Sequence, residues 1–360
     1  MTKTEYIFKT ISSSIFIFST SLIISCTGDP EVKPDSLSVD DSNESTLPAY
    51  LSGVFVINEG NFGSDDGSIS FIDPNGIVRN NIFYENNALR RLGDVVQSMY
   101  VNDTSAFILV NNSNKIEVVD IDEMTLLHTI SVVSLPRYMI SDGKYGYISE
   151  WVSFSDPGRI SILNLDTYEI LDTINVGFGA EALTIRDSKL YVSNNFENNL
   201  SIIDLRTHQI VETISVGSSP AAMVIDKNGD LWVVCSGDYN ANNGSLVRID
   251  SNDDVIQEIS LEMNVSGKLV IENDSSILYF YRGTKVYSYE LGDEIYNTFI
   301  ENTSAISFYG IGISPDGNMY IADSKGFQSR GSVYVYDNAG QMIEEFEVGR
   351  GPNGFVFKSE

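Results

Sequence analysis

Residues 190–220 decide the fold, and they read LYVSNNFENNLSIIDLRTHQIVETISVGSSP. The stretch contains three short runs of β-branched and aromatic residues, at 190–193, 200–204 and 209–214, each bounded by Asn, Asp or Gly. Such runs and boundaries are typical of β-strands. A fourth run, residues 221–225, follows Pro220. Four strands joined by tight turns form an antiparallel unit that cannot bury its faces alone, so the unit is expected to repeat.

Two independent register positions show how often this unit recurs. An acidic or amide residue ends the third strand at intervals of 40 to 47 residues, at Asp73, Asp120, Asn164, Asp204, Asp250, Glu290 and Asp337. The leading position of the first strand recurs at intervals of 40 to 46 residues, at Gln97, Arg137, Glu181, Ala221, Gly267, Tyr309 and Asn353. Both series predict seven units, and this period is typical of the blades of a β-propeller.

The phase of the repeat predicts how the ring closes. The first run of the repeat region, Val54-Phe55-Val56-Ile57, matches a second strand, and the last run, Gly354-Phe355-Val356-Phe357, matches a lone first strand. Joining the two in one blade leaves no open sheet edge. We therefore predict an all-β, seven-bladed β-propeller of four-stranded antiparallel blades over residues 49–360. Residues 353–358 are expected to form the innermost strand beside residues 53–58.

Charge and rare residues narrow the possible functions. The chain has 50 acidic and 22 basic residues, a net charge of −28, and such a surface repels phosphate backbones, so we expect no nucleic-acid partner. Cys26 and Cys235 are the only cysteines, which predicts no disulfide framework, and Cys235 follows a strand where a buried, inert thiol is expected. The only histidines are His128 and His208, which argues against multi-histidine metal sites and a histidine-based triad.

The first 48 residues are predicted to export and anchor the protein. Residues 1–25 have a basic start and a short apolar segment, as in a signal peptide. The sequence Ile23-Ile24-Ser25-Cys26 resembles a bacterial lipobox, which implies lipidation of Cys26; a plain secretory signal is the alternative. Residues 26–48 are rich in Asp, Ser, Pro and Glu and are predicted to be a disordered acidic tether. The acidic residues after Cys26 resemble the surface-export tag of Bacteroidota lipoproteins, which implies an outer-membrane protein facing the cell exterior.

The clearest repeat carries a family resemblance. Residues 191–194 (YVSN), 199–204 (NLSIID) and 211–217 (VETISVG) resemble the YVTN-type β-propeller repeat, as does the turn 313–317 (ISPDG). The opening 56–63 (VINEGNFG) resembles a group of Bacteroidota surface lipoprotein propellers. Some of that group capture corrinoids (vitamin B12) and pass them to a TonB-dependent outer-membrane transporter. The resemblance implies a monomeric binding protein rather than an enzyme, with a corrinoid as ligand and no resident cofactor.

Candidate binding residues gather on one face of the predicted ring. Most loops between second and third strands are long and carry aromatic residues, whereas the opposite face has short turns, so we place binding on the loop face. The aromatic candidates are Phe62, Trp151, Phe196, Tyr239 and Phe327. The polar candidates at inner-strand starts are Gln97, Arg137, Glu181, Tyr309 and Asn353, and those at second-strand ends are Asn58, Glu150, Asn194, Arg282 and Asp323. Taken singly, each of these residues is better explained as capping a strand end and bonding neighbouring loops, whereas for the face as a whole binding is the favoured interpretation.

Two other functions stay open at this point. The same face could bind proteins, which would make the chain an interaction or adhesion scaffold. Alternatively, Asn58, Glu150, Asn194 and Asp323 could converge on a metal at the channel mouth, as in propeller lactonases, which would make it a metal-dependent hydrolase. The acidic loop 61–67 (NFGSDDG) could hold calcium, although it lacks the spacing of a known calcium loop.

Overall fold

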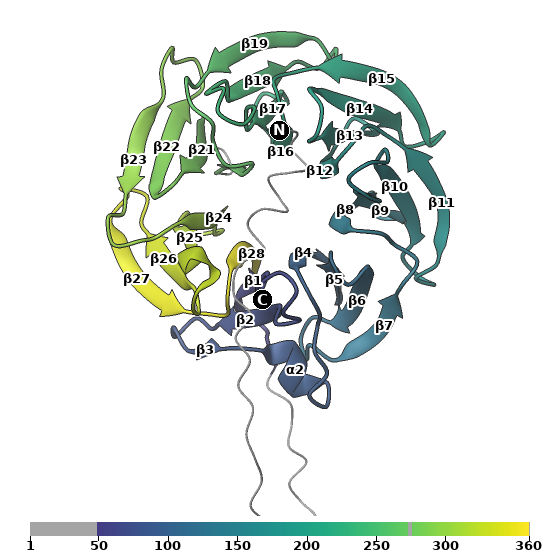
Figure 1. Cartoon of the computed structure of the whole chain (residues 1–360), viewed down its shortest axis with the longest axis vertical. Coiled ribbons are helices and arrows are strands. Elements are labelled where there is room, and N and C mark those ends of the chain that lie inside the picture. The colour runs from purple at the N-terminus through teal and green to yellow at the C-terminus, as the bar shows by residue number, and fades with distance from the viewer. Residues whose placement is uncertain (1–48, 273–275, 360) are drawn as a thin grey trace, which may run out of the picture. The chain divides into compact units, whose positions relative to one another are not determined.

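The computed structural model describes residues 49–272 and 276–359, and the predictions for the first 48 residues, lipidation of Cys26 included, lie outside this part of the chain. The described residues form seven four-stranded antiparallel sheets arranged in a ring (Figure 1), as the repeat predicted. Among these residues, no helix is long and apolar enough to cross a membrane.

Six blades follow the chain without a break, from the inner to the outer strand. Blade 2 is β4 (Val96–Asn102), β5 (Ser105–Val110), β6 (Lys115–Asp120) and β7 (Leu126–Ile130). Blade 3 is β8 (Pro136–Ser141), β9 (Tyr145–Glu150), β10 (Arg159–Asn164) and β11 (Ile170–Asn175). Blade 4 is β12 (Ala180–Arg186), β13 (Lys189–Asn194), β14 (Asn199–Asp204) and β15 (Gln209–Ser215).

The second half of the ring repeats this order. Blade 5 is β16 (Pro220–Ile225), β17 (Leu231–Cys235), β18 (Ser245–Ile249) and β19 (Val255–Ser260). Blade 6 is β20 (Leu269–Ile271), β21 (Ile277–Arg282), β22 (Lys285–Glu290) and β23 (Asn297–Glu301). Blade 7 is β24 (Phe308–Ile313), β25 (Met319–Asp323), β26 (Ser332–Tyr336) and β27 (Met342–Glu347).

Blade 1 combines the two ends of the repeat region and closes the ring. It consists of β28 (Pro352–Lys358), β1 (Gly53–Asn58), β2 (Ser68–Ile72) and β3 (Val78–Arg79). The pairing of β1 with β28 is antiparallel, with Val54 opposite Phe357 and Phe55 opposite Val356. The predicted closure by the C-terminal inner strand is therefore confirmed.

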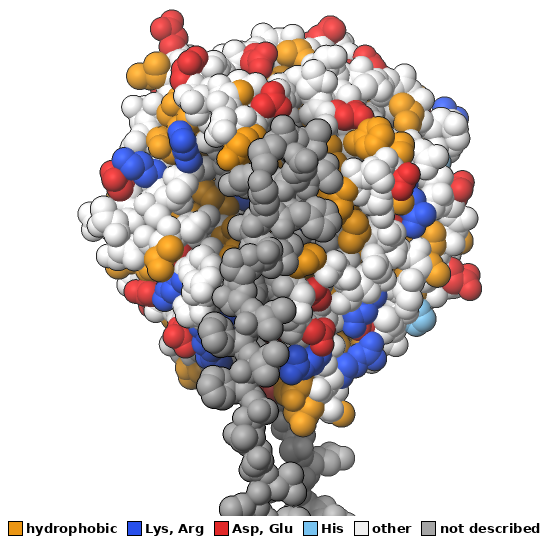
Figure 2. Space-filling view, in the orientation of Figure 1, with side chains coloured by type: hydrophobic (Ala, Val, Ile, Leu, Met, Phe, Trp, Pro, Cys, Tyr) orange, Lys and Arg blue, Asp and Glu red, His pale blue; other side chains and the backbone are white. Residues whose placement is uncertain are grey.

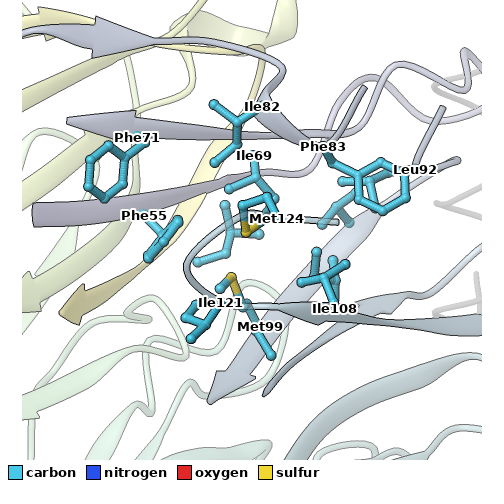
Figure 3. Close-up of a cluster of buried hydrophobic side chains, with 14 of the residues drawn as sticks. Phe55, Ile69, Phe71, Ile82, Phe83, Leu92, Met99, Ile108, Ile121 and Met124 are labelled. Atoms are coloured by element: carbon cyan, nitrogen blue, oxygen red, sulfur yellow. The ribbon is translucent and has the colours of Figure 1, made fainter. Parts of the chain in front are cut away.

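The hydrophobic core lies between neighbouring blades, because the two middle strands of a blade bury both faces. The blade 1–blade 2 cluster in Figure 3 joins Phe55 and Phe71 to Ile108 and Met124. The insertion between these blades contains α2 (Ile82–Asn86), whose Ile82 is fully buried in the same cluster. Outer strands such as β15 are mostly exposed. Figure 2 shows Asp and Glu side chains scattered around the visible face, as expected of an acidic, solvated surface.

Irregular inner-strand starts distinguish the channel from the rest of each blade. The pairing register between the first two strands shifts at the start of β4, β8, β12, β16 and β24. A bulge of this kind interrupts the strict alternation of side chains along a strand. In blade 6, β20 begins at Leu269, so the predicted start at Gly267 was wrong by two residues. Gly267 still lines the central channel.

The thiol of Cys235, at the end of β17, is fully buried. Burial raises the pKa of Cys235 to about 12. A thiol with so high a pKa forms almost no thiolate at neutral pH, so the structure agrees with an inert side chain.

Candidate functional site

A central cavity of about 540 Å³ is the best candidate for a binding site. All seven blades contribute to it, because its wall is built from inner-strand starts and the ends of second strands. Six predicted site residues line it: Gln97, Arg137, Glu181, Arg282, Tyr309 and Asn353. The cavity is lined mainly by polar and charged side chains, and its size falls within the range of small-molecule sites.

Arg137, on β8, is held firmly on the blade 3 side of the cavity. Its Nε and Nη2 donate to the two carboxylate oxygens of Glu181 at 2.8 and 2.7 Å, and its Nη1 donates to Oε1 of Gln97 at 2.5 Å. The guanidinium lies 3.9 Å from the centre of the Trp151 ring, and the Trp151 indole N–H also donates to Glu181, at 2.9 Å. Burial alone would lower the pKa of Arg137. The neighbouring charge of Glu181 raises the pKa by more than burial lowers it, so the guanidinium stays charged and paired.

Glu59 provides a second carboxylate, near the ring closure. The hydroxyl of Tyr309 donates to Glu59 Oε2 at 2.8 Å, and the Nδ2 of Asn353 lies 3.4 Å from the same oxygen. Burial raises the pKa of Glu59, and these hydrogen bonds only partly oppose the rise. Burial and the neighbouring Glu59 charge raise the pKa of Tyr309 well above its ordinary value, so its hydroxyl stays a neutral donor. The amide oxygen of Asn353 is buried and has no hydrogen-bond partner among the described residues.

Three of the predicted loop aromatics, Trp151, Phe196 and Phe327, pack behind the residues that line the cavity. Trp151 packs on Phe196 with ring centres 4.9 Å apart, and Phe154 lies 5.8 Å from Trp151. Phe154 is 53% exposed, so this cluster continues to the surface. On the other side, Phe327 makes an edge contact with Tyr309 at 5.1 Å.

Two glycines make room for these aromatics immediately before inner strands. Gly179 has φ +71°, and a Cβ there would lie 2.7 Å from the Phe196 ring. Gly351 has φ +61°, and a Cβ there would lie 2.4 Å from the Phe327 ring. Glycine is required at both positions because the backbone is left-handed and the ring lies directly against it.

Four polar candidates at second-strand ends are fully buried, and each makes hydrogen bonds to neighbouring groups of the protein. Asn58 donates to Ser70 at 2.9 Å, and Asn194 donates to Ser201 at 3.0 Å. Glu150 binds Arg159 at 2.8 Å, and Asp323 accepts from the backbone N–H groups of residues 306 and 307. The four side chains do not meet at the cavity wall, so the structure gives no support to their convergence on a metal. Their contacts match the alternative interpretation, in which they cap strand ends.

The remaining aromatic candidates lie away from the cavity. Phe62 and Tyr239 are 62% and 63% exposed, and neither lines the cavity. In the acidic loop near Phe62, Asp66 accepts from the backbone N–H of Asn61 at 2.7 Å and pairs with Arg350 at 3.2 Å. The Asp66 carboxylate is therefore already bound by two groups of the protein itself.

Several lining residues were missed by the sequence analysis, chiefly Glu59, Tyr138 and Lys268. Tyr138 directly follows the predicted Arg137, and Lys268 directly follows the predicted Gly267. A strictly alternating strand would turn Tyr138 away from the channel, but the shifted register at the start of β8 lets Arg137 and Tyr138 both line it. Lys268 lies outside regular structure, just before β20. Glu59 lies one residue beyond β1, within the motif VINEGNFG already noted for its resemblance.

The fold and the cavity define a seven-bladed β-propeller with a polar central cavity. The chain belongs to the family described as a domain of unknown function, DUF5074, whose model matches residues 52–358. No curated protein matches the sequence.

Solved structures with the same fold are distant in sequence. A quinoprotein alcohol dehydrogenase-like protein from Bacteroides thetaiotaomicron is 16% identical, with a TM-score of 0.69 over 86% of this chain and 79% of that chain. A candidate 6-phosphogluconolactonase from Bacteroides fragilis is 13% identical, with a TM-score of 0.65 over 90% of this chain and 100% of that one. Hydrazine synthase from Kuenenia stuttgartiensis is 16% identical, with a TM-score of 0.59 over 70% and 85%. At these identities the similarity shows the fold alone.

Proposed function

We propose that this protein is a binding propeller whose ligand enters the central cavity. The observation that carries the proposal is the cavity of about 540 Å³ to which all seven blades contribute polar side chains. Concave sites with a few convergent polar groups are typical of ligand binding. The aromatic cluster of Trp151, Phe154 and Phe196 adds flat apolar surface beside the polar wall.

We propose a corrinoid as the ligand. A corrinoid combines a broad, flat macrocycle with amide side chains, so it needs apolar contact and hydrogen-bonding groups together. Phe154, more than half exposed, offers apolar contact next to the cavity, and Gln97 and Asn353 offer amide groups within it. The resemblance of residues 56–63 to corrinoid-capturing propellers supports the same choice.

The cellular role follows from the first 48 residues. We propose lipidation at Cys26, an outer-membrane location facing the cell exterior, and delivery of the ligand to a TonB-dependent transporter. The lipobox-like sequence and the acidic tether support this role.

Titration of the purified protein with cyanocobalamin tests the proposed ligand. We expect saturable binding at micromolar concentration or tighter, and weaker binding by Phe154→Ala because apolar contact is lost. Leu127→Ala is the matched control, since Leu127 is 52% exposed on β7 and does not line the cavity. Absence of binding by the wild type would remove the corrinoid from the proposal. Equal losses of affinity in the two variants would show that the aromatic cluster does not contribute to binding.

The two alternative functions have their own tests. Capture of a surface protein without any small ligand would favour a scaffold. Hydrolysis of a lactone by the purified protein, dependent on added calcium or zinc, would favour the hydrolase. The burial of Glu150 and Asp323 within their blades gives the hydrolase less support than the binding protein.

A further inference from the structure

Three basic side chains line the central cavity, and they differ in how their charge is balanced. Arg137 is paired with Glu181 at 2.7 Å. Lys268 and Arg282, both from blade 6, have no carboxylate within 4.0 Å in the described part of the chain. Other Lys and Arg side chains of the described residues also lack an ion pair, but among them only Lys268 and Arg282 line the central cavity.

Lys268 is held inside the ring rather than on its surface. Its Nζ donates to the hydroxyl of Tyr138 at 3.1 Å, although Tyr138 belongs to blade 3 and Lys268 comes just before β20. Blades 3 and 6 lie on different sides of the ring (Figure 1), so this bond crosses the channel. An ammonium has three donors, and the contact with Tyr138 uses one of them. The other donors can bind a group that enters the cavity.

Arg282 lies at the same end of blade 6 as Lys268 and lines the same cavity. Leu269 pairs with Phe280, so the register places Arg282, at the end of β21, next to the segment that carries Lys268. The turn to β22 has only two residues, Gly283 and Thr284, which leaves Arg282 exposed at the cavity rim. A guanidinium presents five N–H donors in a planar fork that matches carboxylate and phosphate oxygens.

Neutral polar groups line this part of the cavity, and the Glu59 carboxylate, although beyond ion-pair distance, interacts electrostatically with Lys268. Ser236, Asn264 and Ser266 line the same side of the cavity. Lys268 is partly buried and has no carboxylate within ion-pair distance in the described residues, so an anionic group bound here would improve the electrostatics of the site.

We propose that Lys268 and Arg282, both supplied by blade 6, form an oxyanion site within the central cavity and hold a phosphate or carboxylate group of the ligand. The inference rests on the proposal that the cavity binds a ligand, but it does not require that ligand to be a corrinoid.

Titration calorimetry with inorganic phosphate and, separately, with citrate at low ionic strength tests the inference. We expect saturable one-to-one binding of at least one probe, and the comparison of the two tells a phosphate site from a carboxylate site. Lys268→Gln combined with Arg282→Gln should weaken binding by about tenfold or more. Lys285→Gln is the matched control, because Lys285 lies on the same blade, pairs with Glu301 at 3.0 Å and does not line the cavity.

The inference is overturned if neither probe binds the wild type, or if the double variant binds as well as the control variant. Matching thermal unfolding of all the proteins ensures that a loss of binding is local. Cyanocobalamin binding that survives in the double variant, without any phosphate or citrate binding, would leave the proposed function intact and refute the oxyanion site alone.

Discussion

The two sides of the central cavity carry the same kind of charge but differ in what surrounds it. On the blade 3 side, Arg137 is enclosed by Glu181, Gln97 and Trp151, and its donors are largely used within the protein. The two cations from blade 6, Lys268 and Arg282, have no carboxylate within ion-pair distance in the described residues, and Lys268 donates to the neutral hydroxyl of Tyr138. The comparison teaches that position at the channel does not by itself make a residue a binding residue. The paired cation stabilises the ring, and the unpaired cations are available to a ligand.

The largest expected effect comes from breaking the paired side. Glu181→Gln should lower the free energy of unfolding by about 3 kcal/mol, because Arg137 would remain buried without its countercharge. Lys268→Gln should change it by about 0.5 kcal/mol or less, since no ion pair is lost. Urea denaturation followed by tryptophan fluorescence measures both. Equal effects of the two substitutions would remove the distinction between the two sides.

The next largest effect on the free energy of unfolding is expected from the packing of Phe196 on the blade 3 side. Gly179→Ala should cost about 2 kcal/mol, because it adds a methyl group against the Phe196 ring to the strain of a positive φ. Gly143→Ala is the matched control: Gly143 has φ +89°, but a Cβ there meets nothing within 4 Å. The control should lose only about 1 kcal/mol, the cost of the left-handed backbone. If the two variants unfold alike, close packing of Phe196 on residue 179 is not important for stability.

A smaller effect is expected from Glu59, which lies between the two sides and should make the free energy of unfolding depend on pH. Burial raises the pKa of Glu59 in the native state. At a pH between the ordinary pKa of a glutamate and this raised value, Glu59 is therefore more protonated in the native state than in the unfolded state. Stability therefore falls as the pH rises towards the raised native pKa, and the loss is complete above it. Glu59→Gln removes this titration, while its amide oxygen can still accept from Tyr309.

The measurement is the free energy of unfolding of wild type and Glu59→Gln from pH 4 to pH 8. We expect the variant to gain stability relative to wild type as the pH rises. The exposed carboxylate of Glu212, on β15, supplies the control Glu212→Gln. A constant difference between Glu59→Gln and wild type across this range would show that Glu59 titrates alike in the folded and unfolded states.

The fold was predictable because the same four-strand pattern occurs seven times in the sequence, so each copy supports the interpretation of the others. Two register series, each with seven positions, located the blades, and the incomplete units at the two ends predicted the pairing of β1 with β28. The one error of register, at Gly267, occurred where β20 is only three residues long.

The candidate site was less predictable because local irregularity decides it. Alternation along a strand selected Arg137 but not Tyr138, and only the shifted register of β8 lets both line the cavity. Composition could not separate Asn353, at the cavity wall, from Asn58, which is buried within its blade. Nor could the sequence show that Lys268 reaches Tyr138 across the ring, since 130 residues separate them.

A crystal structure of the protein grown with cyanocobalamin would test the central claim most directly. We predict electron density for the ligand at the central cavity, within reach of Lys268 and Arg282 and extending to the exposed ring of Phe154. Ligand density on the opposite face, near the turn 314–317, or on the outer strands would contradict the account.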